Sequence, residues 1–226
     1  MTDAGTPPGP EGAAPAIRPP RVGVLAVQGA FAEHEAAVAA AGGVATQVRT
    51  PEQLTGLDGL IIPGGESTTF GLVAGRSGLL DAVRDRIAGG LPTLGTCAGM
   101  IMLADATTEG GQSLVGGMDM VVRRNAFGRQ IASFEAELGM PVVGPEPLAA
   151  VFIRAPWIER AGSAVELLAA HGGHPVAARQ GHLLAVAFHP ELTPDTRIHR
   201  LLLDMIRRGR ASSRDSGTGG ERVRAQ

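Results

Sequence analysis

The segment Leu91–Ala104 reads L-P-T-L-G-T-C-A-G-M-I-M-L-A and holds the only cysteine of the 226-residue chain. A short apolar run leads into the sequence G-x-C-x-G at Gly95–Gly99, and a second apolar run with helical character follows. This order predicts a strand, a sharp turn and a helix, with Cys97 at the turn as in a nucleophile elbow. The turn would expose the sulfur, the helix start would favour the thiolate, and the N–H of Ala98 would belong to an oxyanion hole. A buried structural cysteine is the alternative.

The composition indicates a globular protein with a substantial core. Hydrophobic residues make up 44% of the chain, and the net charge of −2 gives no reason to expect a nucleic-acid or membrane partner. Arginine supplies all 20 basic residues, so no lysine is available for a Schiff base. A single cysteine suits a reducing compartment, and we find neither a secretory signal nor an apolar run long enough to span a membrane. These features predict a cytoplasmic protein.

The two ends of the chain differ in composition from the middle. Residues 1–20 are rich in Pro, Gly and Ala, and residues 208–226 are rich in Arg, Ser and Gly. Segments of this kind contain too few large apolar side chains to form a core, so we expect two disordered tails. The sequence therefore predicts one folded domain over residues 21–207.

The first part of that domain alternates between strand and helix patterns. Continuous apolar runs at Arg21–Val27 and Leu57–Ile62 are typical of strands buried on both faces. We expect a third strand at Val44–Val48 and helices at Ala30–Ala41 and Leu79–Ala88. This order predicts an α/β fold with a doubly wound, mostly parallel central sheet flanked by helices and joined by right-handed crossovers.

The strand at Leu57–Ile62 runs directly into P-G-G-E-S-T, residues 63–68. Ligands of open α/β sheets bind beyond the carboxyl ends of the strands, and glycines let the backbone approach a ligand closely. Glu66 and Ser67 could bind a polar or ammonium group. The alternative is a plain turn in which Ser67 caps a helix at Phe70–Ala74.

After the elbow helix the pattern changes to short strands separated by turns, which predicts an antiparallel extension. Arginines occur in this region in the cluster Arg123, Arg124 and Arg129, and again at Arg154 after a strand. An arginine binds a carboxylate through two hydrogen bonds, so these side chains could hold an acidic substrate. A solvated charged surface is the competing interpretation. The expected strands are Met118–Val122, Phe134–Leu138, Leu148–Ile153, Ala164–Leu168 and Pro175–Arg179.

A final apolar strand, Leu183–Phe188, ends in His189-Pro190-Glu191. In an extended chain residues i and i+2 point the same way, so the Glu191 carboxylate can bind one imidazole nitrogen of His189. The other nitrogen then remains for a thiol, which predicts a Cys97-His189-Glu191 triad. A closing helix is expected from the cap Thr193 to Arg207.

The other histidines carry weaker signals. His171 and His174 have a spacing that a metal could use, but no further ligands support them, so we expect a surface turn and no metal site. His34, at a helix start between two glutamates, is expected to be solvated. His182 and His199 give no signal.

Six segments occur in an order that resembles a known family. They are G-V-L-A-V-Q-G-A (23–30), P-G-G-E-S-T (63–68), G-T-C-A-G-M-I (95–101), R-N-A-F-G-R-Q (124–130), F-I-R-A-P (152–156) and F-H-P-E-L (188–192). The chain resembles the class I glutamine amidotransferases, whose fold is flavodoxin-like. Within that class it resembles the glutaminase subunits of pyridoxal 5′-phosphate synthase.

The resemblance implies a role for each site residue. Cys97 would attack the side-chain amide of L-glutamine, His189 would move the proton, and Glu191 would orient His189. The oxyanion would be held by Ala98 and by the backbone of Gly64 and Gly65. Substrate-binding residues would be Gly65, Glu66, Ser67, Arg124, Ile153 and Arg154.

The resemblance also implies a partner. Ammonia would pass to a synthase subunit that builds pyridoxal 5′-phosphate from a pentose phosphate and a triose phosphate, within a large complex that activates the glutaminase on docking. Gln28 and the first helix would be interface elements, and no metal or organic cofactor would be needed.

Other functions stay open on the residues alone. A different Cys-triad hydrolase, such as a γ-glutamyl hydrolase or a DJ-1-like protein, would share the elbow and H-P-E, but it would leave R-N-A-F-G-R-Q and F-I-R-A-P unexplained. Further alternatives are the glutaminase of another amidotransferase and a catalytically silent binding subunit.

Overall fold

The computed structural model describes residues 18–27, 29–65, 78–111, 113–128 and 133–217, with side chains up to residue 212. A seven-stranded sheet forms its centre, in the order β10-β11-β12-β4-β3-β1-β2. The five strands from β12 to β2 run parallel, whereas β11 and β10 are antiparallel to their neighbours. The expected α/β class with a mostly parallel sheet is confirmed. The bounds of the parallel strands are β1 Arg21–Leu25, β2 Val44–Val48, β3 Gly59–Ile62, β4 Thr93–Thr96 and β12 Leu183–Val186.

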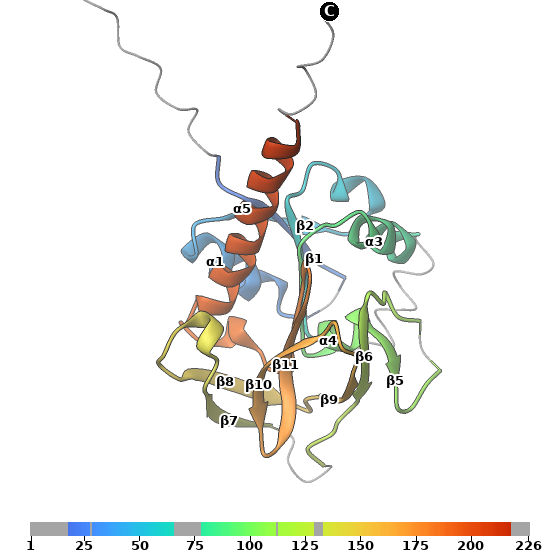
Figure 1. Cartoon of the computed structure of the whole chain (residues 1–226), viewed down its shortest axis with the longest axis vertical. Coiled ribbons are helices and arrows are strands. Elements are labelled where there is room, and N and C mark those ends of the chain that lie inside the picture. The colour runs from blue at the N-terminus through green and yellow to red at the C-terminus, as the bar shows by residue number, and fades with distance from the viewer. Residues whose placement is uncertain (1–17, 28, 66–77, 112, 129–132, 218–226) are drawn as a thin grey trace, which may run out of the picture.

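Helices cover both faces of this sheet (Figure 1). Helices α1 (Phe31–Ala40) and α5 (Arg197–Gly217) lie on one face, and α3 (Leu79–Ala88) and the short α4 (Ala98–Leu103) lie on the other. Short 3-10 turns, η1 (Pro51–Leu54), η2 (Pro141–Val143) and η3 (Pro190–Leu192), connect the elements. None of the helices in the described part of the chain has the length and apolar character needed to cross a lipid bilayer.

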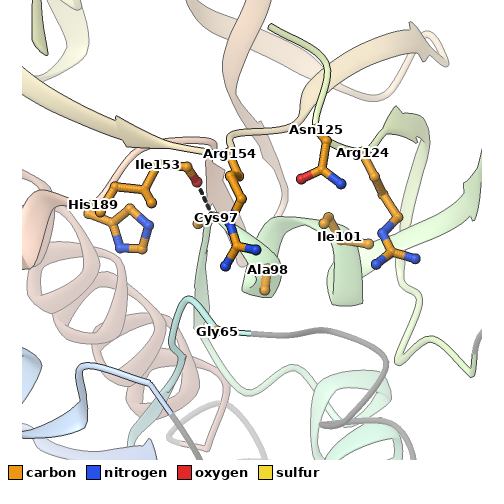
Figure 2. A pocket seen from close by; sticks show the side chains of 9 residues that line it. All are labelled: Gly65, Cys97, Ala98, Ile101, Arg124, Asn125, Ile153, Arg154 and His189. Atoms are coloured by element: carbon orange, nitrogen blue, oxygen red, sulfur yellow. Dashed lines mark hydrogen bonds between the residues drawn. The ribbon is translucent and has the colours of Figure 1, made fainter. Parts of the chain in front are cut away.

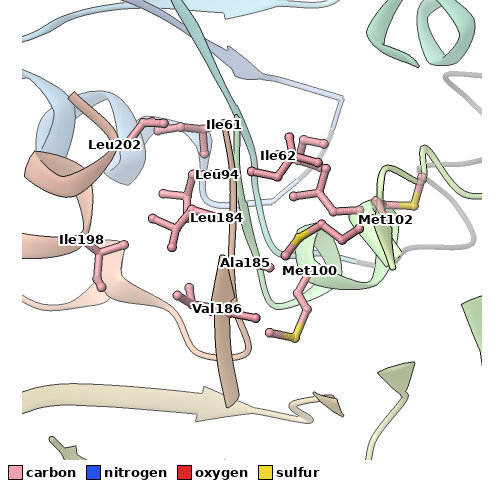
Figure 3. Packing of buried hydrophobic residues seen from close by; sticks show 14 of the residues in the cluster. Ile61, Ile62, Leu94, Met100, Met102, Leu184, Ala185, Val186, Ile198 and Leu202 are labelled. Carbon is pink, nitrogen blue, oxygen red and sulfur yellow. The ribbon is translucent and has the colours of Figure 1, made fainter. Parts of the chain in front are cut away.

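The central strands are buried on both faces because helices pack on each side. Every residue of β3, β4 and β12 is buried, as the continuous apolar runs predict. Figure 3 shows Leu94 and Leu184 facing Ile198 and Leu202 of α5 on one side of the sheet. Met100 and Met102 of α4 pack with Ile62 on the other side.

The predicted antiparallel extension is distributed over three sheets. Strands β10 (Glu166–His171) and β11 (His174–Gln180) extend the central sheet, while β7 (Ser133–Leu138) and β8 (Leu148–Ile153) pair separately. A third sheet holds β6 (Met118–Arg123) between two strands that the sequence analysis did not predict. These are β5 (Ala104–Thr107) and β9 (Trp157–Ala161), short segments without an apolar run or a clear alternation.

The closing helix begins later than expected. It starts at Arg197 rather than at Thr193 and Pro194, because Asp195 accepts a hydrogen bond from the backbone N–H of Arg197 at 3.0 Å. The Thr193 hydroxyl instead lies in a turn, where it accepts a hydrogen bond from the N–H of Asp195.

Ordered contacts also extend past both expected domain boundaries. Helix α5 runs ten residues beyond Arg207, to Gly217. At the other end, the Arg18 guanidinium binds the Asp58 carboxylate at 2.7 and 2.9 Å. The helix extension and Arg18 both fall in segments predicted to be tails, so the folded part of the chain is longer than its composition indicates.

Candidate active site

Three neighbouring strands of the sheet bring the predicted triad and the glycine loop after β3 together. Gly64 follows β3, Cys97 follows β4 and His189 follows β12, and β4 lies between the other two strands. Because these strands are parallel, their carboxyl ends meet at one edge of the sheet. Residues separated by up to 125 positions therefore come together in one place, as the sequence predicts for the Cys97, His189 and Gly64 segments.

The elbow has the strained geometry that its sequence predicts. Cys97 has φ 50° and ψ −104°, a left-handed conformation that costs a non-glycine residue about 1–3 kcal/mol. Gly99 is required for a different reason, since a Cβ there would lie 1.9 Å from the carbonyl oxygen of Ile62 on β3. The glycine thus lets α4 pack directly against the sheet, and α4 holds the turn in place.

The imidazole and carboxylate of the triad form a short hydrogen bond. His189 Nδ1 lies 2.7 Å from Glu191 Oε1, and the carboxylate is fully buried. Pro190 and Glu191 belong to η3 rather than to an extended strand. The expected His189–Glu191 pair therefore forms in a tight turn and not in extended chain. With Nδ1 engaged, Nε2 of His189 is the nitrogen left for the thiol.

Burial and charge act in opposite directions on His189. Burial lowers its pKa, but hydrogen bonds to Cys97 and Glu191 and the negative charges of both partners raise the pKa to about 10. The pKa of Glu191 is lowered, against its burial, mainly by the His189 hydrogen bond and the nearby His34. The arrangement therefore favours a carboxylate–imidazolium pair, which would stabilise a thiolate on Cys97.

The triad opens into a cavity of about 400 Å³. Figure 2 shows Cys97, Ala98 and Ile101 on one side of it, with Arg154 and Arg124 reaching in from other segments. Its lining combines arginine and asparagine side chains with apolar ones, an arrangement that can orient a polar small molecule. Its lining consists of Gly65, Cys97, Ala98, Ile101, Arg124, Asn125, Ile153, Arg154 and His189.

The cysteine is almost enclosed. Cys97 is only 7% exposed to solvent. Its Sγ donates a hydrogen bond to the carbonyl oxygen of Ile153 at 3.7 Å (Figure 2). A group at the end of a long, thin substrate could reach it, which suits an amide on a flexible side chain. The interpretation of Cys97 as a purely structural residue does not explain its place in the cavity wall.

Of the three predicted oxyanion-hole residues, Ala98 and Gly65 line the cavity and Gly64 does not. Ala98 is the first residue of α4, where a backbone N–H has no acceptor within the helix, and Gly65 lines the cavity. The N–H of Gly64, by contrast, donates to the Thr96 hydroxyl at 3.1 Å, and Gly64 is not in the cavity wall. In this state the Gly64 amide is turned away from the reacting atoms. Its lack of a side chain is still essential, since a Cβ would lie 2.4 Å from the His189 ring.

Four of the six predicted substrate-binding residues line the cavity: Gly65, Arg124, Ile153 and Arg154. Glu66 and Ser67, Arg129 of the arginine cluster, and Gln28 of the predicted interface lie outside the described residues. Arg123 points elsewhere and pairs with Glu159 at 2.9 Å.

Two buried histidines were missed or misjudged. His34 was expected to be solvated, but it is fully buried behind Glu191, and His199 lies against it. A signal existed for His34, because positions 31, 34, 38 and 41 follow the period of one helix face and the other three are apolar. Asn125 was also missed, although it lines the cavity.

His171 and His174 flank the turn between β10 and β11, and His174 stacks on Trp157 with ring centroids 3.6 Å apart. Among the residues that the structure describes, no group of three or more His, Cys, Asp or Glu could hold a metal ion.

Comparison with known proteins identifies close relatives. The profile of the SNO glutamine amidotransferase family matches residues 24–208. Pyridoxal 5′-phosphate synthase subunit PdxT of Streptomyces avermitilis is 56% identical over 193 residues, which cover 84% of this chain and 96% of that protein. The PdxT of Pelotomaculum thermopropionicum is also 56% identical, over 81% of this chain and 94% of its own.

Solved structures agree with the sequence comparison. The crystal structure of a glutamine amidotransferase, 49% identical, superposes with a TM-score of 0.78 and covers 82% of this chain and 98% of the other. A glutamine amidotransferase from Thermotoga maritima, at 15% identity and a TM-score of 0.56, covers 85% of this chain and 92% of its own and shares the fold.

Proposed function

The chain belongs to the SNO glutamine amidotransferase family, and on that basis we propose that Cys97, His189 and Glu191 carry out its glutaminase reaction. The chain is the glutaminase subunit of a pyridoxal 5′-phosphate synthase: it hydrolyses L-glutamine to glutamate and ammonia and acts with a synthase partner subunit. The contact of 2.7 Å between His189 Nδ1 and Glu191 Oε1, beside Cys97 in the cavity wall, carries the assignment of the catalytic residues.

The reaction begins with the thiolate of Cys97. Sγ attacks the side-chain amide carbon of glutamine, and His189 Nε2 donates a proton to the departing ammonia. Water then attacks the resulting thioester, His189 accepts its proton, and glutamate leaves. Glu191 holds the imidazole in the tautomer and orientation that both steps need.

The developing negative charge on the amide oxygen requires hydrogen-bond donors beside Cys97. We assign this role to the N–H groups of Ala98 and Gly65. Gly64 would contribute only after its amide leaves the Thr96 hydroxyl, so we expect the hole to be incomplete in the state described above. Binding of the synthase subunit is the event that we propose completes it.

The charged ends of glutamine require partners at the other side of the cavity. Arg154 and Arg124 suit the α-carboxylate. Ile153, whose carbonyl oxygen lies 3.7 Å from Cys97 Sγ, would contact the substrate near the reacting amide. Gly65, Glu66 and Ser67 complete the proposed substrate site, although the last two lie outside the described residues.

We further propose that the chain works in the cytoplasm, in a large hetero-oligomeric complex, without nucleic acid, membrane or cofactor. The folded domain that does so corresponds to the expected range 21–207, lengthened by the ordered residues at both ends.

The test is glutaminase activity of the chain alone and mixed with a pyridoxal 5′-phosphate synthase subunit. We expect activity to rise on mixing and to disappear in Cys97→Ala, with Cys97→Ser as a second control of similar size. An active Cys97→Ala variant would exclude the nucleophile. Equal activity with and without the partner would favour a general amide hydrolase instead.

A further inference from the structure

The triad acid has a second partner that the reaction scheme does not use. Glu191 Oε1 binds His189, whereas Glu191 Oε2 faces Nε2 of His34 at 3.3 Å. Both the His34 and the Glu191 side chains are completely shielded from solvent. His34 comes from α1, so a helix that packs on one face of the sheet reaches the acid of a triad built on other elements.

His34 is itself the middle member of a chain of contacts. Its Nδ1 lies 3.0 Å from Nε2 of His199 on α5, and its Nε2 lies 3.2 Å from the Thr96 hydroxyl. Thr96 accepts the N–H of Gly64 at 3.1 Å. The group therefore joins the triad acid to the turn after β3. The His34–Glu191 member is a buried polar contact at 3.3 Å, and the other members are buried hydrogen bonds.

The surroundings determine which nitrogen of each ring carries a proton. Glu191 Oε2 is a buried acceptor, so His34 must present an N–H from Nε2 and leave Nδ1 as an acceptor. His199 then donates from Nε2, and its own Nδ1 is a bare lone pair. This agrees with His199 Nδ1 having no hydrogen-bond partner, because a buried acceptor without a partner is tolerated better than a buried N–H. Glu191 Oε2 also lacks an aligned hydrogen bond within the described residues, so its contact with His34 Nε2 at 3.3 Å is the nearest polar contact given for it.

Both histidines stay neutral. Burial lowers the pKa of His34, and burial together with the neighbouring His34 lowers the pKa of His199 to about 3. The charged groups near His34 are Glu191 and Glu33, which oppose this shift, and His189, which adds to it. A neutral imidazole beside the Glu191 oxygen does not cancel its negative charge, so the carboxylate can still stabilise the imidazolium of His189.

From these contacts we infer that His34 is a positioning residue of the triad: its ring, with Nε2 3.3 Å from the outer oxygen of Glu191, restrains that oxygen and thereby the plane in which Glu191 holds His189. His199 in turn fixes the tautomer and the ring plane of His34. The inference rests on the proposed role of Glu191, and it adds α1 and α5 to the elements on which catalysis depends.

The test uses two amide substitutions that differ in reach. In His34→Gln the amide N–H can occupy the place of Nε2 and reach Glu191. In His34→Asn the shorter amide occupies the place of Nδ1 and can reach only His199. Kcat, KM for L-glutamine and the pH profile of kcat/KM are measured for the full chain in complex with the synthase subunit.

We expect His34→Asn to lower kcat about 10- to 100-fold, the size of effect that a misplacement of about 1 Å produces, with KM changed less than about threefold. The acid limb of its pH profile should shift, because Glu191 no longer holds His189 in a fixed plane. His34→Gln should recover most of kcat and the wild-type profile.

A purely structural role of His34 predicts a different pattern. Equal losses in both variants, or a better His34→Asn than His34→Gln, would overturn the inference, as would an unchanged kcat in His34→Asn. If His34→Asn does not fold, the imidazole shifts of His189 in His34→Gln, followed by NMR, decide the question: a titration like that of wild type supports the inference, and an altered one contradicts it.

The outcome is separable from that of the proposed function. An inactive wild-type complex, or an active Cys97→Ala complex, would contradict the glutaminase assignment of the site. An active wild type with an inactive Cys97→Ala and an unaffected His34→Asn would contradict the positioning role alone.

Discussion

At the scale of single residues, backbone strain is concentrated in the cavity wall. Among the described residues, three that are not glycine have positive φ: Cys97, Asn125 and Arg154, and all three line the cavity. Such conformations persist only where the surrounding structure imposes them, and they occur preferentially at functional sites. Backbone strain therefore points to the same cavity as the positions of Cys97 and His189, although it is a separate observation.

Arg154 allows strain and charge to be separated. It has φ 44°, which costs a residue with a Cβ about 1–2 kcal/mol. Arg154→Ala removes the guanidinium alone, and Arg154→Gly removes both the guanidinium and the strain. We expect the same rise in KM for glutamine in both, with Arg154→Gly more stable by about 1 kcal/mol in urea unfolding. An unchanged KM would remove Arg154 from the substrate site.

His189 gives a prediction about pH. Its pKa of about 10 in the folded chain lies above its usual 6.5, so its protonated form stabilises the fold fully below pH 6.5, and this contribution is lost as pH rises toward 10. Cys97→Ala removes one of the two negative partners and should lower the His189 pKa. The check is an NMR titration of the His189 ring in both proteins. Identical curves would mean that no thiolate contributes.

At the scale of elements, the buried pair of His34 and His199 ties α1 to α5. Because His199 stays neutral in the fold with a pKa of about 3, only the unfolded chain binds a proton there between pH 6.5 and 3. Stability should therefore fall as pH decreases through that range, by up to about 1.4 kcal/mol per pH unit for this group.

The measurement is urea unfolding at pH 7, 6 and 5 for wild type and for His199→Phe. The variant should have a lower free energy of unfolding at pH 7. This free energy should fall less on acidification, because the variant lacks the buried neutral histidine whose unfolded form binds a proton. Parallel pH dependences would show that His199 does not carry this effect.

The turn that presents Arg124 is held by one aromatic ring. Phe127 makes ring contacts with Phe134 at 5.2 Å, Trp157 at 5.3 Å and Phe152 at 5.7 Å. Phe127→Ala should release the turn and raise KM for glutamine, while kcat stays near wild type because the triad is anchored on the central strands.

A Phe→Ala substitution at a fully buried site lowers the free energy of unfolding by about 3–5 kcal/mol. Phe127 is only half-buried, so we expect a smaller decrease for Phe127→Ala. Phe31→Ala on α1, also half-buried, is the matched control for lost packing. A rise in KM in both variants would point to general loosening rather than to this turn.

The sequence predicts elements well where one strong pattern decides them. Helix α3 and strands β2 and β8 match their expected bounds, because apolar periodicity and flanking turn residues agree there. Strands β5 and β9 lack such a pattern, since their conformation depends on pairing with β6, a distant segment. The start of α5 also escaped prediction, because Asp195 and Thr193 compete as caps over two residues.

The placement of Cys97, His189 and Glu191 at one edge of the sheet could be predicted because they follow strands with clear signals. The two histidines buried behind Glu191 could not be predicted in this place. His34 and His199 come from two helices whose contact depends on the tertiary fold. The state of Gly64, whose amide binds Thr96, is equally invisible in the sequence.

At the scale of the whole molecule, Asp58 joins both ends of the folded chain. Its carboxylate accepts bonds from Arg18 and from the Arg21 N–H, and it pairs with Arg210 near the end of α5. Burial raises the Asp58 pKa, but these partners outweigh it and lower the pKa to about 2. Its stabilising contribution is therefore present above about pH 4 and is lost as pH falls toward 2.

Asp58→Asn should lower the melting temperature and make the last turns of α5 more accessible to trypsin, which cleaves after arginine. Asp204→Asn is the control, because the Asp204–Arg207 pair lies on the surface within one helix, where such pairs contribute little. Equal proteolysis of the two variants would show that Asp58 does not fasten the helix.

The position of the one sulfhydryl has a practical consequence. Cys97 is the only thiol of the chain and opens on the cavity, so an alkylating glutamine analogue would label each chain once, and the mass gain would count competent sites in a preparation. The same fact is a weakness under peroxide. A sulfenic acid formed there would have no second cysteine in the chain to trap it as a disulfide, so recovery would depend on a small-molecule or protein reductant from outside.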